Sequence, residues 1–408
     1  MDQFIIDQIA MSLRAIPYHL ARSFFIPGEN EETRAFREKV GYICGVCHPH
    51  EEYDLLKEAN IEWVRFDIPF PFERDGSVSP SYEDFKKRCK GYRDRDIKVM
   101  AVSPFPKHFT DAGMDTRGND ANLKKVAEFM IEDLQGYVNG IQITNESGIP
   151  HFTIPYTVAE CAEFIGKTAM YMYPKRGDIV IGYNSGGPQA DLHVRMKPWF
   201  RYMDYVGFDL YMGCFMNMPG FLWVFDAIAR YLWSLSGKPI LLEEFGYISD
   251  GAPKTKDQKK IILQKYGVSS EKEAYRDIVH FIDKLPRDFQ HMIRFTQPDE
   301  AKQGDRIFKS DLINHLYCEL PRLTKIPGFP HTQEGQAKFF KVMIPRLYEK
   351  KFMAGSIVYC WADSDKCYYC GQEECPTETR WGLVDRFAKP KASFYAVRDA
   401  FGFIRENR

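Results

Sequence analysis

The sequence of 408 residues has almost no net charge and no long apolar run. Its 55 basic and 56 acidic residues leave a formal charge of −1, which indicates neither a nucleic-acid-binding patch nor attraction to an anionic membrane. No run of about 18 apolar residues occurs, so we expect no membrane-spanning helix. The N-terminus carries Asp2 and Asp7 and lacks the apolar segment of a secretory signal peptide. These absences predict a cytoplasmic protein without nucleic-acid or membrane partners.

What the sequence does contain is a regular alternation of strand-like and helix-like segments. Apolar residues make up 44% of the chain, enough for a large core. The segment 121–134, for example, has apolar residues at helical spacing, and 138–146 has the apolar run of a strand. We expect eight strands, at 41–46, 61–70, 96–105, 138–146, 178–184, 203–211, 238–246 and 354–363.

Eight strands that each precede a helix predict parallel βαβ units, and therefore an α/β fold of the (β/α)₈ or TIM-barrel type. Residues 1–39 would form an N-terminal arm or cap, and 40–408 the barrel. A long insertion, about 247–331, would follow the seventh strand. The competing fold is an open doubly wound sheet. Such a sheet usually has a Gly-rich phosphate loop after its first strand, and GVCHPHEE offers none.

Two of the expected strands end in a glutamate. The fourth strand closes on Asn145 and Glu146, and the seventh on Glu243 and Glu244. A single acid at a strand end is usually a rim carboxylate. Acids from strands four and seven, however, can face each other across the mouth of a barrel and divide acid and nucleophile roles. Because successive strand residues point to opposite faces, Glu243 and Glu244 are not expected to face this mouth together.

These motifs resemble clan A of the retaining glycoside hydrolases, which includes families 2, 5 and 39. In that clan an Asn–Glu pair ends strand four, as in TNES here, and a second Glu precedes an aromatic–Gly pair on strand seven, as in EEFG. Three further matches are Arg65 in WVRFD, Tyr211 in FDLY and Trp361 at the end of strand eight. The resemblance covers about 40–404, apart from the insertion.

The resemblance implies that Glu146 is the acid/base and Glu244, which directly precedes the aromatic–Gly pair, the nucleophile. Arg65 would keep Glu244 ionised, although an ordinary salt bridge to Asp67 or Glu62 is the alternative.

The other candidate residues would bind the substrate. Asn145 could bind the sugar 2-hydroxyl, and Tyr211 could orient the nucleophile. Trp361 could offer a flat face to a sugar ring, or could be a buried core residue. His108 and Asn184 are weaker candidates for contacts with sugar hydroxyls.

The expected function is hydrolysis of a β-linked glycoside with retention and without a cofactor. The absence of an export signal favours exo action on small intracellular glycosides or oligosaccharides. The insertion could close one end of the groove or build a dimer contact, so a homo-oligomer stays open. Two alternatives also stay open: a metal-dependent barrel isomerase or hydrolase that uses Asp67, Asp209 and Asp363 with the two glutamates, and a non-catalytic carbohydrate-binding barrel.

Four of the ten cysteines cluster in CWADSDKCYYCGQEEC. Cys360, Cys367, Cys370 and Cys375, with a C-x-x-C among them, could form a tetrahedral structural zinc site. Reduced thiols on a loop are the alternative.

Overall fold

The eight strands of the computed structural model form one parallel sheet that curves into a barrel. The structure describes residues 3–153, 156–214, 221–251, 254–285, 287, 290, 326–367 and 376–408. The strands are β1 (Ile43–Cys47), β2 (Trp63–Asp67), β3 (Lys98–Val102), β4 (Gly140–Ile143), β5 (Val180–Tyr183), β6 (Val206–Asp209), β7 (Ile240–Phe245) and β8 (Met353–Val358). Their order is β5-β4-β3-β2-β1-β8-β7-β6. The predicted TIM barrel is thus confirmed.

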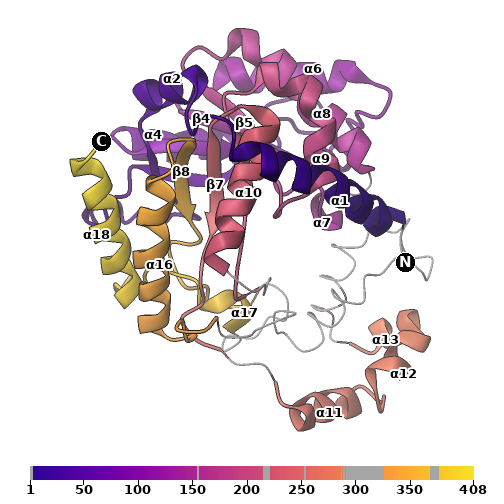
Figure 1. The fold of residues 1–408 in the computed structure, drawn as a ribbon. Helices are drawn as coiled ribbons and strands as arrows, with labels where there is room; N and C mark the ends of the chain where they lie inside the picture. The colour runs from indigo at the N-terminus through magenta and orange to yellow at the C-terminus, as the bar shows by residue number, and fades with distance from the viewer. Residues whose placement is uncertain are drawn as a thin grey trace.

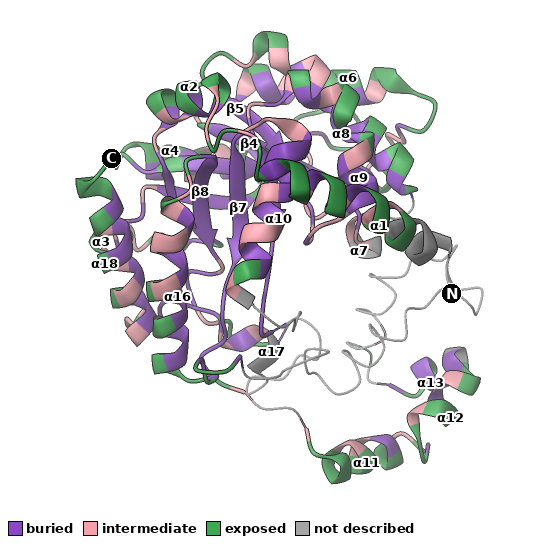
Figure 2. Ribbon diagram, in the orientation of Figure 1, coloured by how far each residue is buried: buried purple, intermediate pink, exposed green. Residues whose placement is uncertain are grey.

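The two outer strands of this order approach each other and bring the barrel close to closure. The amide of Asp204 donates to the carbonyl of Ile181 over 2.7 Å, and Gly186 and Asp209 form a parallel bridge. The strands are buried along almost their whole length (Figure 2), as expected for parallel strands covered by helices.

Helices alternate with the strands and surround the barrel (Figure 1). They are α3 (Tyr53–Glu58), α4 (Pro80–Arg93), α5 (Pro106–Asp111), α6 (Asp120–Asp133), α7 (Pro150–Thr153), α8 (Val158–Met172), α9 (Ala190–Arg195), α10 (Phe221–Ser236), α16 (Gln333–Tyr348), α17 (Pro376–Thr379) and α18 (Ala392–Glu406), with 3₁₀ turns at Tyr173–Lys175 and Lys197–Tyr202. Their outer faces are exposed and their inner faces buried, so the apolar spacing in the sequence marks the side that packs on the sheet. Among the described helices, none is long and apolar enough to cross a membrane.

The N-terminal arm is helical and packs on the barrel. Helix α1 (Gln3–Ser23) lies against α9 and α10 (Figure 1). Helix α2 (Glu31–Val40) begins with a capping box between Asn30 and Thr33. Its Phe36 packs edge-on against Tyr205 at the amino end of β6, with ring centroids 6.3 Å apart. Helix α2 therefore lies at the end of the barrel where the strands begin, whereas α1 packs on the outer helices α9 and α10.

The insertion after β7 contains three described helices, α11 (Lys256–Lys265), α12 (Glu271–Arg276) and α13 (Ile278–Asp283). They share a small apolar core of their own, which includes Leu263, Phe281 and Leu285. Cys367, from the segment after β8, also packs into this core. The extensions that follow β7 and β8 therefore meet, and Figure 1 shows the three helices apart from the ring of helices around the barrel.

Candidate active site

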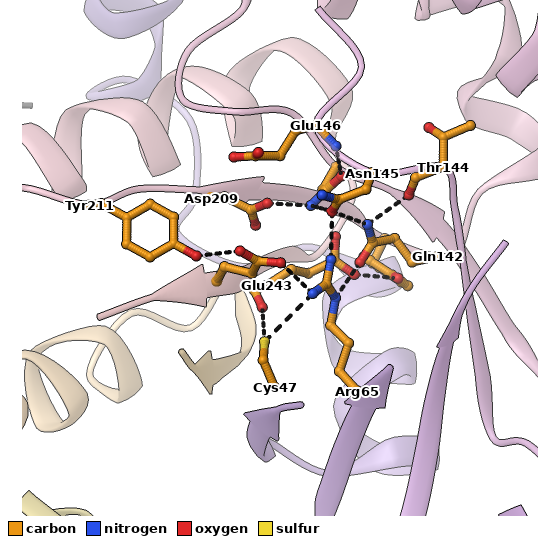
Figure 3. Close-up of polar contacts among 12 residues, drawn as sticks. Cys47, Arg65, Gln142, Thr144, Asn145, Glu146, Asp209, Tyr211 and Glu243 are labelled. Carbon is orange, nitrogen blue, oxygen red and sulfur yellow. Dashed lines mark hydrogen bonds and ion pairs between the residues drawn. The ribbon is translucent and has the colours of Figure 1, made fainter. Parts of the chain in front are cut away.

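The side chain of Arg65, on β2, joins groups from β4, β7 and the segment after β4 at the carboxyl end of the barrel (Figure 3). It is 2% exposed. Its Nη1 donates to Glu244 Oε1 of β7 over 2.5 Å, and its Nε donates to Gln142 Oε1 of β4 over 2.6 Å. Its Nη2 donates to Asn145 Oδ1 over 2.7 Å. Arg65 thus pairs with Glu244, whereas Glu62 pairs with Arg408.

Both oxygens of Glu244 accept hydrogen bonds from fixed donors. Oε1 accepts from Arg65, and Oε2 accepts from the hydroxyl of Tyr211, which follows β6. The carboxylate is 7% exposed, so one cation and one hydroxyl orient it in a nearly dry environment. The carboxyl of Glu244 is therefore fixed in one orientation through both of its oxygens.

Glu146 is half-buried just beyond β4, in a backbone conformation that L-residues rarely adopt. Its φ is +41°, and its amide donates to Asn184 Oδ1 over 2.8 Å. Burial raises the pKa of its carboxyl to about 8, and the charge of Glu244 adds to this while Arg65 opposes it. This raised pKa favours the protonated form of Glu146 at neutral pH, chiefly because the carboxyl is buried.

The side chains of Asn145 and Asn184 are linked to each other and to Asp209. Asn184 Nδ2 donates to Asp209 Oδ2 over 2.6 Å and to Asn145 Oδ1 over 3.3 Å. Asn184 is fully buried, so it braces Glu146 rather than facing a sugar, unlike the sequence-based expectation. Asn145 is half-buried and stays a candidate for substrate contact. Burial, together with the charges of Glu244 and Glu146, raises the pKa of Asp209.

A bulge in β7 breaks the two-residue period on which the expected orientations of Glu243 and Glu244 rested. Leu242 pairs with Phe208 but Glu244 pairs with Asp209, so Glu243 is the extra residue. Glu243 Oε1 accepts from Tyr205 Oη over 2.7 Å, and the same hydroxyl lies 3.4 Å from Met100 Sδ of β3. The Tyr205 hydroxyl thus links Glu243 of β7 with Met100 of β3. Because β3 and β7 are not neighbouring strands, this link crosses the barrel interior. Burial raises the pKa of Glu243 to about 8.

Trp361 lies in the core rather than in the site. Its indole is fully buried and donates Nε1–H to Glu52 Oε2 over 2.8 Å, so neither ring face is open to a sugar. The aromatic residue that β8 contributes to the site is Tyr359, which is half-buried. Its ring centroid is 5.5 Å from that of Tyr211 and 5.6 Å from that of Trp381. The sequence IVYCW offers both Tyr359 and Trp361, and periodicity alone does not separate them.

Three further polar side chains, His48, Asp67 and His108, lie at or just beyond the carboxyl ends of β1, β2 and β3. His108, on α5, is half-buried with its ring 3.8 Å from that of Phe105. Burial lowers the pKa of both His48 and His108, and the charge of Asp67 partly opposes this effect at each ring. His48 and Asp67 are exposed, so they can reach a ligand.

The cysteine cluster is only partly described. Cys360 Sγ donates to the carbonyl of Ala362 over 3.3 Å, and Cys367 packs with the insertion helices. Cys370 and Cys375 lie outside the described residues, so the zinc site stays a prediction. Within the described ranges, no group of three or more His, Cys, Asp or Glu side chains is arranged to hold a metal. Asp363, a candidate ligand, pairs with Lys391 over 2.9 Å.

Neither the protein-family models nor the curated proteins contain a match to this chain. Solved structures do. A family 39 glycoside hydrolase from Bacteroides cellulosilyticus WH2 matches with a TM-score of 0.53 at 12% identity, over 88% of this chain and 63% of that one. The family 53 catalytic domain from Ignisphaera aggregans matches with a TM-score of 0.52 at 16% identity, over 90% of this chain and 93% of that one. A family 2 β-galacturonidase from Eisenbergiella tayi matches with a TM-score of 0.50 at 12% identity, over 89% of this chain and 51% of that one.

These likenesses establish the fold. The chain is a (β/α)₈ barrel, structurally similar to the catalytic domains of glycoside hydrolases. It spans about half the length of the β-galacturonidase and less than two thirds of the family 39 enzyme. Because unrelated activities share one fold, the activity has to be argued from the side chains of the site.

Proposed function

We propose that this protein is a retaining glycoside hydrolase that cleaves a β-linked glycoside by double displacement. The observation that supports this most directly is the asymmetry of two carboxyls at one end of the barrel. Arg65 and Tyr211 hold Glu244 as an anion, while burial and the charge of Glu244 keep Glu146 protonated. An acid beside a held nucleophile is what glycosidic cleavage with retention needs.

In the first step, Glu244 attacks the anomeric carbon and Glu146 gives its proton to the departing glycosidic oxygen. The bond from carbon to the leaving oxygen breaks as the bond from carbon to Glu244 forms. Asn145, held through its Oδ1 by Arg65, is placed to present its amide to the sugar 2-hydroxyl, a contact that strengthens in the transition state.

In the second step, Glu146 acts as a base. It takes a proton from water, the water attacks the anomeric carbon, and Glu244 leaves as a carboxylate. Two inversions give net retention. The reaction needs no group beyond the side chains named and water, so we propose hydrolysis without a cofactor.

The substrate we propose is a small glycoside or oligosaccharide with a terminal β-linked sugar. The half-buried ring of Tyr359 would supply aromatic surface to the substrate, and His48, Asp67 and His108 would supply polar groups for its hydroxyls. One structural neighbour is a β-galacturonidase seen with galacturonate, so uronides belong among the sugars to be tested.

The test starts with nitrophenyl β-glycosides of glucose, galactose, mannose, xylose, glucuronic acid and galacturonic acid. Glu244→Ala should abolish turnover of the best substrate, and azide should restore it with inverted product stereochemistry. A 2-deoxy-2-fluoro glycoside should label Glu244, as read by peptide mass spectrometry. Glu62→Gln, which changes a glutamate just before β2 at the other end of the barrel, is the matched control and should retain activity.

Near wild-type turnover by Glu244→Ala would refute the nucleophile assignment. Glu146→Ala gives a second, independent reading, because loss of the acid should slow glycosides with poor leaving groups far more than dinitrophenyl glycosides. An equal loss on both kinds of substrate would contradict the role of Glu146.

A further inference from the structure

The loop that follows β5, residues 184–187, holds the proposed acid in place. Asn184 accepts the hydrogen bond from the amide of Glu146, and this contact supports the unusual φ of that residue. A Cβ on Gly186 would lie 3.0 Å from Glu146 Oε1, so the loop also lies directly against the carboxyl. Any shift of this loop therefore moves Glu146.

Behind the loop lies a buried imidazole, that of His193 on α9. It is fully buried, with Nδ1 2.7 Å from Tyr183 Oη at the end of β5 and Nε2 2.7 Å from Ser185 Oγ in the loop. Ser185 Oγ in turn donates to the carbonyl of Gly187 over 2.7 Å. One ring therefore ties the strand end, the loop and a helix together.

Counting hydrogens fixes the direction of each of these bonds. The single hydroxyl hydrogen of Ser185 goes to the carbonyl of Gly187, which can only accept. Ser185 Oγ must then accept from His193, so Nε2 carries the ring proton and Nδ1 accepts from the hydroxyl of Tyr183. Burial lowers the pKa of His193 to about 3, which agrees with a neutral ring. The donors run one way, from Tyr183 through His193 and Ser185 to Gly187.

The far side of the loop is fixed to β6. The amide of Asp209 donates to the carbonyl of Ser185 over 2.8 Å, and the amide of Gly187 donates to the carbonyl of Asp209 over 2.8 Å. The side chain of Asp209 also orients the amide of Asn184. Because β6 fixes one side of the loop and the His193 imidazole fixes the other, Asn184 is held where it accepts the hydrogen bond from Glu146.

We propose that the hydrogen-bonded chain Tyr183–His193–Ser185 is a positioning device for the general acid Glu146. Its members act through Asn184 and the loop, because each of them is fully buried and out of reach of a substrate. The catalytic consequence rests on the proposed glycosidase function, whereas the mechanical link from the chain to Glu146 does not. Losing one link leaves a buried donor or acceptor unsatisfied, which loosens the loop.

The mechanical link is tested by hydrogen exchange, read by mass spectrometry on peptides that span 141–149. Tyr183→Phe and Ser185→Ala should each speed exchange of this segment by about tenfold. The matched control is Tyr231→Phe. Tyr231 is also buried, with its ring centroid 6.4 Å from that of His193, but its hydroxyl makes no hydrogen bond to any described residue. This variant should leave exchange of 141–149 unchanged.

The catalytic consequence is tested by the leaving-group dependence of kcat/KM. Both chain variants should lower kcat/KM for a methyl β-glycoside about tenfold more than for the dinitrophenyl glycoside of the same sugar, since only the former needs the acid. A defect that merely reduces the folded fraction lowers both values equally, as urea midpoints would show. Tyr231→Phe should keep the wild-type ratio.

Unchanged exchange in both Tyr183→Phe and Ser185→Ala would overturn the positioning role, whatever the activity. If exchange becomes faster but the ratio of kcat/KM between the two glycosides stays at the wild-type value, the proposed effect on catalysis is overturned. A wild-type protein that cleaves no glycoside would instead refute the proposed function, and the exchange measurement would still decide whether the chain holds Glu146.

Discussion

Replacing Glu243 with glutamine should make the stability of the folded protein less dependent on pH. Glu243 is fully buried beneath the nucleophile, and burial raises its pKa from 4.5 to about 8. In the unfolded chain this carboxyl loses its proton near its ordinary pKa. Between about pH 4.5 and 8 the folded state therefore binds more protons than the unfolded state, and stability falls as the pH rises through this window.

The size of the effect follows from the shift. One pKa unit corresponds to about 1.4 kcal/mol, so the cost of keeping Glu243 protonated grows by about 3 kcal/mol between pH 4.5 and 7. Glutamine cannot ionise, and its amide oxygen can still accept from Tyr205. Relative to the wild type, the free energy of unfolding of Glu243→Gln should therefore rise by about 3 kcal/mol over this range. Glu146 and Asp209 are present in both proteins, so their contributions cancel in the difference.

Urea unfolding of both proteins at pH 4.5, 5.5 and 7 measures this difference. Glu38→Gln, at an exposed position on α2, is the control, and its difference from the wild type should stay flat. A flat difference for Glu243→Gln as well, within about 0.5 kcal/mol, would show that Glu243 is not held as a neutral acid.

The remaining predictions concern the site. Because Glu146 must carry its proton, kcat/KM should fall as the pH rises through about 8, measured from pH 5 to 10. Tyr211→Phe removes the hydroxyl that donates to Glu244, and it should lower kcat about 10- to 100-fold even with dinitrophenyl substrates. Arg65→Met leaves a buried carboxylate unpaired and should cost about 3–5 kcal/mol in urea unfolding. Full activity should persist in excess EDTA, and its loss would favour the metal-dependent alternative.

The fold could be predicted from the sequence because apolar periodicity and turn spacing carry it. Segments such as 138–146 and 238–246 pack their apolar runs between the interior and the helices, so a parallel strand is the only arrangement that buries both faces. The positions of Glu146 and Glu244 follow from the fold, since both close strands that end on one side of the barrel. Arg65 and Tyr211 also contact Glu244, in line with the roles that the resemblance implied.

The features that the sequence did not reveal depend on contacts between distant segments. The bulge at Glu243 is a change of register against β6 and β8, and a two-residue period contains no sign of it. The contact of Tyr183 and Ser185 with His193 depends on how α9 lies against the end of β5. The one sign of such a contact in the sequence was Glu243, the acid beside Glu244. A second glutamate inside a buried strand needs a hydrogen-bond partner from another segment.

In the proposed mechanism, the cation paired with Glu244 helps Glu146 to serve first as acid and then as base. Among the described acids, Glu244 is the one that forms an ion pair with Arg65, and the charge of Glu244 is one cause of the raised pKa of Glu146. When Glu244 becomes an ester in the glycosyl-enzyme, that charge disappears, while Arg65 stays and favours a carboxylate on Glu146. The first step thus moves one negative charge from Glu244 to Glu146 beneath a constant positive charge. The second step returns it, so the buried site never has to hold two uncompensated carboxylates.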